Sequence, residues 1–270
     1  MAERTILEEP TTLAPDNPEI TAMYKAGMHF GYSKTRRHPG MRPYIFGTKS
    51  NIEVFDLFRV FPKIQETLNA VRAMGATGKM LFFVGTKASA REAVESTAKE
   101  LQMPYVTQRW LGGTLTNFKI ITERVQYWQN LKHQKESGEL KKYTKHEQTK
   151  FSQHITKLEY MFSGLEELKR IPHALMVIDL KEESLAVQEA RRRKIDVIAL
   201  SNTDTDPLLA THLIPGNDNA KASISYVLGK IANAYKEGVL QKSLAPEVQS
   251  EATNQTGEPK QNNDTHHDQS

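Results

Sequence analysis

The chain has 270 residues, of which 38% are hydrophobic and none is cysteine, and its formal net charge is +4. That length allows one large domain or two small ones. The lack of cysteine excludes disulfides, cysteine-zinc sites and thiol catalysis. No apolar run approaches the roughly 20 residues that span a bilayer, and the acidic start of the chain does not resemble a signal peptide. We therefore expect a soluble cytoplasmic protein.

Charge is unevenly distributed along the chain. Residues 1–18 hold four acids and one arginine, and residues 245–270 hold five acids and one lysine. The middle of the chain therefore has a larger positive excess than the net charge suggests. We expect residues 1–18 to form a flexible N-terminal arm. Residues 241–270 should form a disordered acidic tail, because they have too few apolar side chains to offset the entropy lost on ordering.

A basic loop follows a short helix that is predicted over residues 19–27 and ended by Gly27. Its cations are Lys34, Arg36, Arg37 and Arg42, with His38 among them and no acid. Tyr32 and Tyr44 flank this loop. Arginine and lysine on a turn beside aromatic rings suit phosphate contacts and base stacking. A solvated run of charge would give the same pattern, so the loop alone leaves both interpretations open.

Short apolar runs alternate with helical patterns through most of the chain. Strands are predicted at residues 51–57, 79–84, 104–107, 174–179 and 196–201. A loop should connect the last strand to residue 218. This βα alternation predicts an α/β fold with a doubly wound parallel sheet, built from residues 19–117 and 171–240.

The helices between these strands show apolar stripes at helical spacing. One stripe starts at Phe61, which places Pro62 in a first helical turn. Another follows Ser89 and Glu92, whose spacing is that of a capping box. Further helices are expected at residues 185–194 and from residue 220 to Gly238, with Asn217 or Asp218 as the cap of the last one.

Residues 118–170 show a different sequence pattern, with long, charged helical segments and no predicted strand. Two apolar stripes step by three and four, and Ser137-Gly138 breaks the chain between them. This predicts an inserted antiparallel helical hairpin with a coiled-coil seam. The seam residues would be Phe118, Ile121, Val125 and Trp128 against Phe151, Ile155, Leu158, Phe162 and Leu165. Residues 119–170 hold eleven Lys or Arg, including Lys119 and Arg124, against seven Glu, so the hairpin is a candidate RNA-binding rod.

Gly85-Thr86-Lys87 is a candidate phosphate site, because it follows a strand and precedes a helix. This segment is neither a Walker loop nor a dinucleotide fingerprint. Together with the aspartates at positions 179, 204, 206 and 218, Lys87 would suit an enzyme acting on a phosphorylated ligand. Aspartates in loops more often build turns and caps. The histidines show no metal-ligand spacing, and no nucleophile motif is present, so no catalytic residue, metal or cofactor is predicted.

The most specific motif is Trp110-Leu111-Gly112-Gly113-Thr114-Leu115-Thr116-Asn117-Phe118, preceded by Arg109. By itself it predicts a tight joint before a helix, capped by Thr116 or Asn117, beside a basic and aromatic surface. The motif closely resembles the signature of the bacterial ribosomal protein S2 family. The resemblance continues in the same order through His29-Phe30-Gly31, residues 41–47, residues 83–87, residues 172–179 and residues 214–218, and it spans roughly residues 20–238.

This resemblance implies a flavodoxin-like sheet with a helical hairpin insertion. It implies a structural, ribosome-bound component of the small subunit that binds ribosomal RNA and neighbouring ribosomal proteins, including ribosomal protein S1, and takes no small-molecule substrate. The expected RNA contacts are Lys34, Arg36, Arg37, His38, Arg42, Lys87, Arg109, Trp110, Lys119 and Arg124. Tyr32 and Arg37 stand where the family usually has histidine and tryptophan, so a metal ligand there does not carry over. A phosphate-ligand enzyme and a pure protein-docking scaffold are the alternatives.

Overall fold

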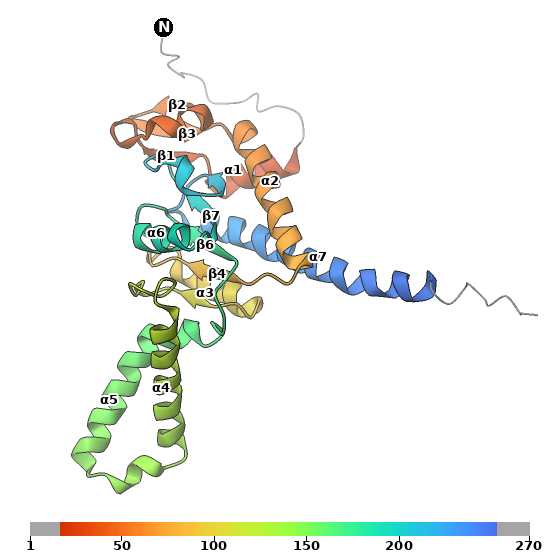
Figure 1. The fold of residues 1–270 in the computed structure, drawn as a ribbon. Coiled ribbons are helices and arrows are strands. Elements are labelled where there is room, and N and C mark those ends of the chain that lie inside the picture. Colours follow the sequence, from red (N-terminus) through yellow and green to blue (C-terminus); the bar gives the residue numbers. More distant parts are fainter. Residues whose placement is uncertain (1–16, 253–270) are drawn as a thin grey trace, which may run out of the picture.

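The computed structural model describes residues 17–252. Its centre is a parallel sheet with the strand order β5-β4-β6-β7-β8 (Figure 1). The strands are β4 (Leu81–Val84), β5 (Tyr105–Val106), β6 (Ala174–Ile178), β7 (Asp196–Ser201) and β8 (His212–Pro215). Every residue of β4 and β6 is buried, as expected for strands that are covered on both faces. The predicted parallel sheet is confirmed, and β8 adds a strand where the sequence suggested only loop.

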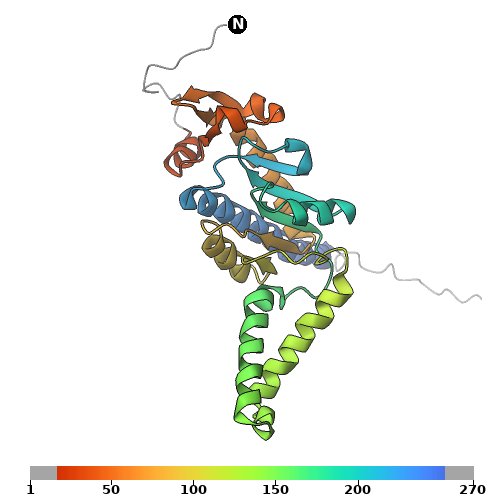
Figure 2. The same ribbon diagram turned by 90° about the vertical axis from the view of Figure 1, so that its left-hand side faces the viewer.

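Helices cover both faces of this sheet (Figures 1 and 2). The helices of one layer are α2 (Leu57–Ala76), α3 (Arg91–Glu100) and α7 (Lys221–Ala252). The other face packs against α6 (Ser184–Arg192) and the segment around Trp110. Within β4, Phe83 belongs to the first core and Phe82 to the second, which follows from the alternation of side chains along a strand. The arrangement is therefore doubly wound.

A second, smaller sheet precedes the parallel one, and the sequence pattern predicts only one of its three strands. Its antiparallel order is β1-β3-β2, with β1 (Phe30–Ser33), β2 (Ile45–Lys49) and β3 (Ile52–Phe55). Only β3 falls within the predicted strand at residues 51–57. Ser50 and Asn51, with φ of 48° and 64°, form the tight turn between β2 and β3. Ser-Asn is not the usual hairpin signal, so the turn is hard to recognise from sequence.

The structure corrects the expected helix boundaries at several places. Helix α1 (Pro18–Lys25) matches the short helix predicted there. Helix α2 begins at Leu57, capped by Asp56, so Pro62 lies inside it rather than in its first turn. The Ser89 capping box does not form, because Ala90 occupies the cap position of α3 without a side-chain bond.

The predicted end of the last helix is wrong. Helix α7 does not stop at Gly238 but continues to Ala252, so part of the predicted disordered tail is helical. Residues 1–16 and 253–270, which hold most of the predicted arm and the rest of the tail, lie outside the described residues.

Two helices lie between β5 and β6 in the chain, α4 (Phe118–Glu136) and α5 (Lys145–Phe162). Both project away from the sheets (Figures 1 and 2). Gly138, at φ +82°, begins the 3-10 turn that connects them. Near the sheet, Trp128 and Phe162 join the core that also contains Phe82. Farther out, Leu131, Leu140 and Ile155 form a small cluster of their own.

No helix in the described part of the chain is long and apolar enough to cross a membrane. Among the same residues, no group of three or more His, Asp or Glu side chains is arranged to hold a metal ion.

Candidate RNA interface

The basic loop at residues 34–42 is held in one conformation by bonds to the rest of the fold. The backbone NH of His38 donates to the carbonyl of Thr203 over 2.8 Å, and that of Lys34 donates to the carbonyl of Asn51 over 3.1 Å. The His38 Nδ1 accepts from the NH of Gly40. The loop therefore presents Lys34, Arg36 and Arg42, all exposed, on a fixed backbone, whereas His38 serves the loop itself.

Arg37 points inward rather than outward. Its guanidinium donates to Glu53 over 2.9 Å, and the Glu53 side chain has no solvent exposure. Burial raises the pKa of Glu53, against the lowering effect of Arg37. A buried carboxylate whose paired cation is removed becomes very costly. The Arg37 side chain is thus committed to the fold, and the exposed cations of the loop are Lys34, Arg36 and Arg42.

Tyr32 connects the loop to the parallel sheet. The Arg36 guanidinium lies 5.8 Å from the centre of the Tyr32 ring, and the Lys87 ammonium lies 5.9 Å from it. The Arg36 distance suits a cation–π contact, whereas the Lys87 ammonium donates to the Tyr32 hydroxyl over 3.2 Å at the edge of the ring. The ring is half-buried, so Arg36 is oriented by Tyr32 while it stays exposed to solvent.

Lys87 lies at the carboxyl end of the sheet, between the ends of β4 and β6, where the strand order reverses and where such folds bind ligands. Its ammonium is 2.5 Å from Asp179 and 3.4 Å from Asp218, and it donates to Tyr32 and Asn219. Burial disfavours its charged form, but the two aspartates outweigh burial and hold the pKa of Lys87 above its usual range. The lysine is neutralised by its own chain.

The aspartates at this crevice are equally engaged. Asp218 is fully buried, and burial raises its pKa to about 6, helped by Asp179 and opposed by Lys87. Asp179 holds a left-handed backbone at φ +72°, and its side chain accepts from the NH of Lys181. Glu183 accepts from the NH of Thr86 over 2.6 Å. A phosphate here would meet carboxylates, so the arrangement opposes the anionic ligand that the enzyme hypothesis requires.

The segment from Trp110 to Thr116 wraps around one carboxylate, that of Glu189 on α6. Glu189 accepts from the Trp110 indole and from the NH groups of Gly113, Leu115 and Thr116, at 2.7–3.2 Å, and also from the Thr116 hydroxyl. Burial would raise the pKa of Glu189, but these donors outweigh it and lower that pKa. Gly113, at φ +95°, makes the required turn. The segment is therefore an internal clamp that fixes the start of α4.

Trp110 does not belong to a surface. It is 7% exposed, its ring packs 5.5 Å from that of Phe82, and its NH is bound by Glu189. This corrects the expected aromatic surface, because Trp110 has no open face for a base. One weak signal in the sequence could have identified Glu189, which is an acid beside Ala186, Val187 and Ala190 on the apolar side of α6.

Arg109, Lys119 and Arg124 are exposed at and near the start of α4. Asn117 occupies the predicted cap position of that helix but makes no capping bond with its side chain. The predicted cations therefore form two separate groups. Lys34, Arg36 and Arg42 lie in the segment that joins β1 to β2, and the other three lie at or near the start of α4. The three-stranded sheet and the projecting helices are at opposite ends of the molecule (Figure 1).

The fold and the site define a doubly wound α/β protein with a self-neutralised crevice and two exposed basic groups. The model of the family "Ribosomal protein S2" matches residues 23–238. The chain is 38% identical to the small ribosomal subunit protein uS2 of Amoebophilus asiaticus, over 88% of this chain and 77% of the relative. It is 41% identical to that of a Roseiflexus species over 81% and 84% of the two chains, and 39% identical to that of Dictyoglomus turgidum over 80% and 88%. The chain belongs to the ribosomal protein S2 family.

Proposed function

We propose that this chain is a structural component of the small ribosomal subunit that holds ribosomal RNA through two exposed basic groups. The main support for this proposal is that some of the predicted RNA-binding cations are exposed, whereas others are paired with acids of the chain. Lys34, Arg36, Arg42, Arg109, Lys119 and Arg124 are exposed, whereas Lys87 and Arg37 are bound by buried acids of the chain itself. Phosphate contacts position RNA and supply most of the salt-dependent affinity.

A member of this family is a structural protein and not an enzyme. The crevice at the carboxyl ends of the strands supports that conclusion on physical grounds. Its lysine is paired with Asp179 and Asp218, so these groups serve to join the loops that follow β4, β6 and β8. We assign Lys87 to this internal network instead of to an RNA contact.

In this proposal α4 and α5 form an antiparallel hairpin with a coiled-coil seam, inserted at residues 118–170 into a sheet domain of residues 19–117 and 171–240. The support is that buried residues recur at helical spacing on both helices: Val125 and Trp128 on α4 and Ile155 and Phe162 on α5 are buried. Lys132 adds an ion pair between the helices, because its ammonium lies 3.8 Å from the carboxylate of Glu159 on α5.

The proposal includes protein partners. A ribosomal protein contacts its neighbours as well as RNA, and ribosomal protein S1 is the partner that the family resemblance implies. It also places the protein in the cytoplasm, bound to the ribosome.

Co-sedimentation tests the proposal. Tagged full-length protein should travel with small subunits at low salt and leave them as salt rises, because phosphate contacts release counterions. Protein that remains free at every salt concentration would contradict a ribosomal role. Binding that is insensitive to salt would instead favour a scaffold held by proteins alone.

A further inference from the structure

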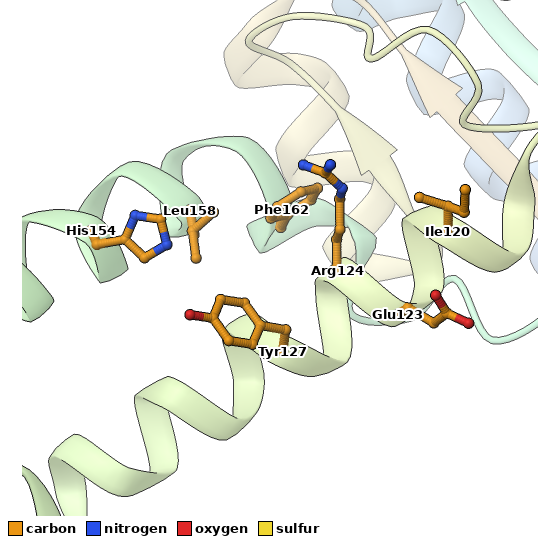
Figure 3. A pocket seen from close by; sticks show the side chains of 7 residues that line it. All are labelled: Ile120, Glu123, Arg124, Tyr127, His154, Leu158 and Phe162. Atoms are coloured by element: carbon orange, nitrogen blue, oxygen red, sulfur yellow. The ribbon is translucent and has the colours of Figure 1, made fainter.

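A groove opens between α4 and α5 close to the sheet (Figure 3). Its volume is about 370 Å³, which falls within the range of small-ligand sites. The lining residues are Ile120, Glu123, Arg124, Tyr127, His154, Leu158 and Phe162. It therefore combines an apolar floor with charged and aromatic groups at its edges.

Packing between α4 and α5 does not account for the apolar and aromatic side chains at this groove, because two of them remain exposed. Ile120 is 45% exposed and Tyr127 is 53% exposed, although both lie beside the buried stripe of α4. The Tyr127 ring stands edge-on to His154, with ring centres 6.4 Å apart. Large apolar and aromatic groups that are left open around a hollow mark a binding surface more often than isolated exposed residues do.

Arg124 gives the groove its charge preference. Among the described side chains of residues 17–242 its guanidinium has no ion-pair or hydrogen-bond partner. Figure 3 shows the Arg124 guanidinium beside the groove and the Glu123 carboxylate pointing away from that guanidinium. Lys119, five residues earlier on α4, is also exposed, although it does not line the groove. An unpaired arginine over an apolar floor suits a ligand with a phosphate and a flat ring, since guanidinium groups bind phosphate and stack on planar groups.

We propose that this α4–α5 groove holds one unpaired nucleotide of ribosomal RNA, with its base against Tyr127 and Leu158 and its phosphate on Arg124. The inference rests on the proposed function and names the RNA feature that the projecting helices recognise. Unpaired bases stack on aromatic side chains in this manner, and a base in a duplex cannot. The groove would thus select a bulged or looped nucleotide by shape, whereas the basic loop at residues 34–42 reads phosphates only.

Photo-crosslinking tests which molecule occupies the groove. The full chain with p-benzoylphenylalanine in place of Tyr127 would be assembled into small subunits that lack the native protein. We expect crosslinks at a single RNA position, mapped by reverse-transcription stops. Crosslinks to a protein, which would point to a peptide occupant, would overturn the proposal. So would an absence of crosslinks in protein that sediments with the subunits.

Substitutions test whether the groove contributes to affinity. Tyr127→Ala should weaken binding to small subunits about tenfold, the loss expected for one base stacked on a ring. Tyr160→Ala is the matched control, because Tyr160 is a 59% exposed tyrosine on α5 outside the groove, and the affinity of this variant should not change. Equal losses in both variants, or no loss in Tyr127→Ala, would reject the groove. Failure of the unsubstituted chain to bind subunits would reject the proposed function itself.

Discussion

Gly75 of α2 and Gly238 of α7 meet where the two helices cross. A Cβ atom on Gly238 would lie 2.0 Å from the carbonyl oxygen of Arg72, and one on Gly75 would lie 2.3 Å from that of Tyr235. No side chain fits at such distances, so glycine is required on both helices. The close crossing brings α2 and α7 together over one face of the parallel sheet.

Gly238→Ala should therefore destabilise the protein. Its methyl group would push against the backbone of α2, and overpacking of this kind costs about 2 kcal/mol, or roughly 5 °C in Tm for a chain of this size. Gly229→Ala is the control, because no atom lies within 4 Å of the added methyl group and alanine favours a helix by about 1 kcal/mol. Thermal unfolding should show opposite shifts for the two variants, and a neutral Gly238→Ala would contradict the contact.

Gly238 also shows where prediction from sequence succeeds and where it fails. The apolar runs that become β4, β6 and β7 were recognisable because they are short, continuous and bounded by helical patterns. A glycine after an amphipathic helix looks like a stop signal, but whether it ends a helix or lets another helix approach depends on a residue 163 positions away, Gly75. Local patterns do not contain that information.

In the candidate site, too, local sequence predicts some residues correctly and fails for those whose partners are distant in the chain. Lys34, Arg36 and Arg42 could be assigned to the surface from sequence, because no acid is nearby in the chain. The partner of Arg37 is Glu53, and the partners of Lys87 are Asp179 and Asp218, all reached only through the fold. Trp110 was expected at the surface for the same reason: its partner Glu189 is distant in sequence, and nothing near the motif indicates it.

Removal of the Glu189 carboxylate should loosen the segment from Trp110 to Thr116. Glu189→Ala leaves the buried donors of Trp110 and Leu115 and the partly buried NH of Gly113 without an acceptor, and each unsatisfied buried donor costs about 1–3 kcal/mol. We expect a fall in the free energy of unfolding of at least about 3 kcal/mol, measured with urea. Glu189→Gln keeps one acceptor oxygen and should lie between Glu189→Ala and the unsubstituted protein. Equal stability of all three proteins would show that the clamp is not needed.

The lowered pKa of Glu189 also makes the stability of the protein depend on pH. Its pKa is lower in the folded protein than the usual 4.5, so its stabilising effect is complete above that value and is lost as the pH falls through the folded pKa. The advantage of the unsubstituted protein over Glu189→Gln should therefore shrink below about pH 4.5. A difference in unfolding free energy that stays constant in acid would contradict this assignment.

Asp218 should have the opposite effect in a neighbouring pH range. Its folded pKa is about 6, above the usual 3.8, so the folded protein binds an extra proton between these values. Stability then falls as the pH rises from about 4 to about 6. Asp218→Asn removes this titration, and urea unfolding across that range should show the unsubstituted protein losing stability relative to the variant. A difference that is flat with pH would place the proton elsewhere.

The basic loop should contribute to the salt dependence of RNA binding. Arg36→Ala with Arg42→Ala removes two exposed cations, and the slope of log affinity against log salt should fall by about 0.7–0.9 for each phosphate that is no longer neutralised. Arg37→Ala is unsuitable, because it would leave Glu53 buried without its cation. Lys63→Ala with Lys99→Ala removes two exposed charges elsewhere and should leave the slope unchanged. If both double variants had the same slope, the loop would not contact phosphate.

The projecting helices should open from their far end without unfolding the sheet. Ile155 belongs to the small outer cluster with Leu131 and Leu140, whereas Trp128 shares its core with Phe82 of β4. Ile155→Asp would place an unpaired charge in the outer cluster only, and a cluster of a few side chains cannot offset that cost. We expect fast hydrogen exchange around residues 131–155 and unchanged protection in β4.

Tyr160→Asp provides the control for the same measurement, because Tyr160 is exposed on α5 and a charge there stays in water. It should leave exchange in both regions unchanged. Loss of protection in β4 on Ile155→Asp would show that the helices and the sheet unfold as one unit. Strong protection of residues 131–155 in Ile155→Asp would show that contacts other than the outer cluster hold the helices together.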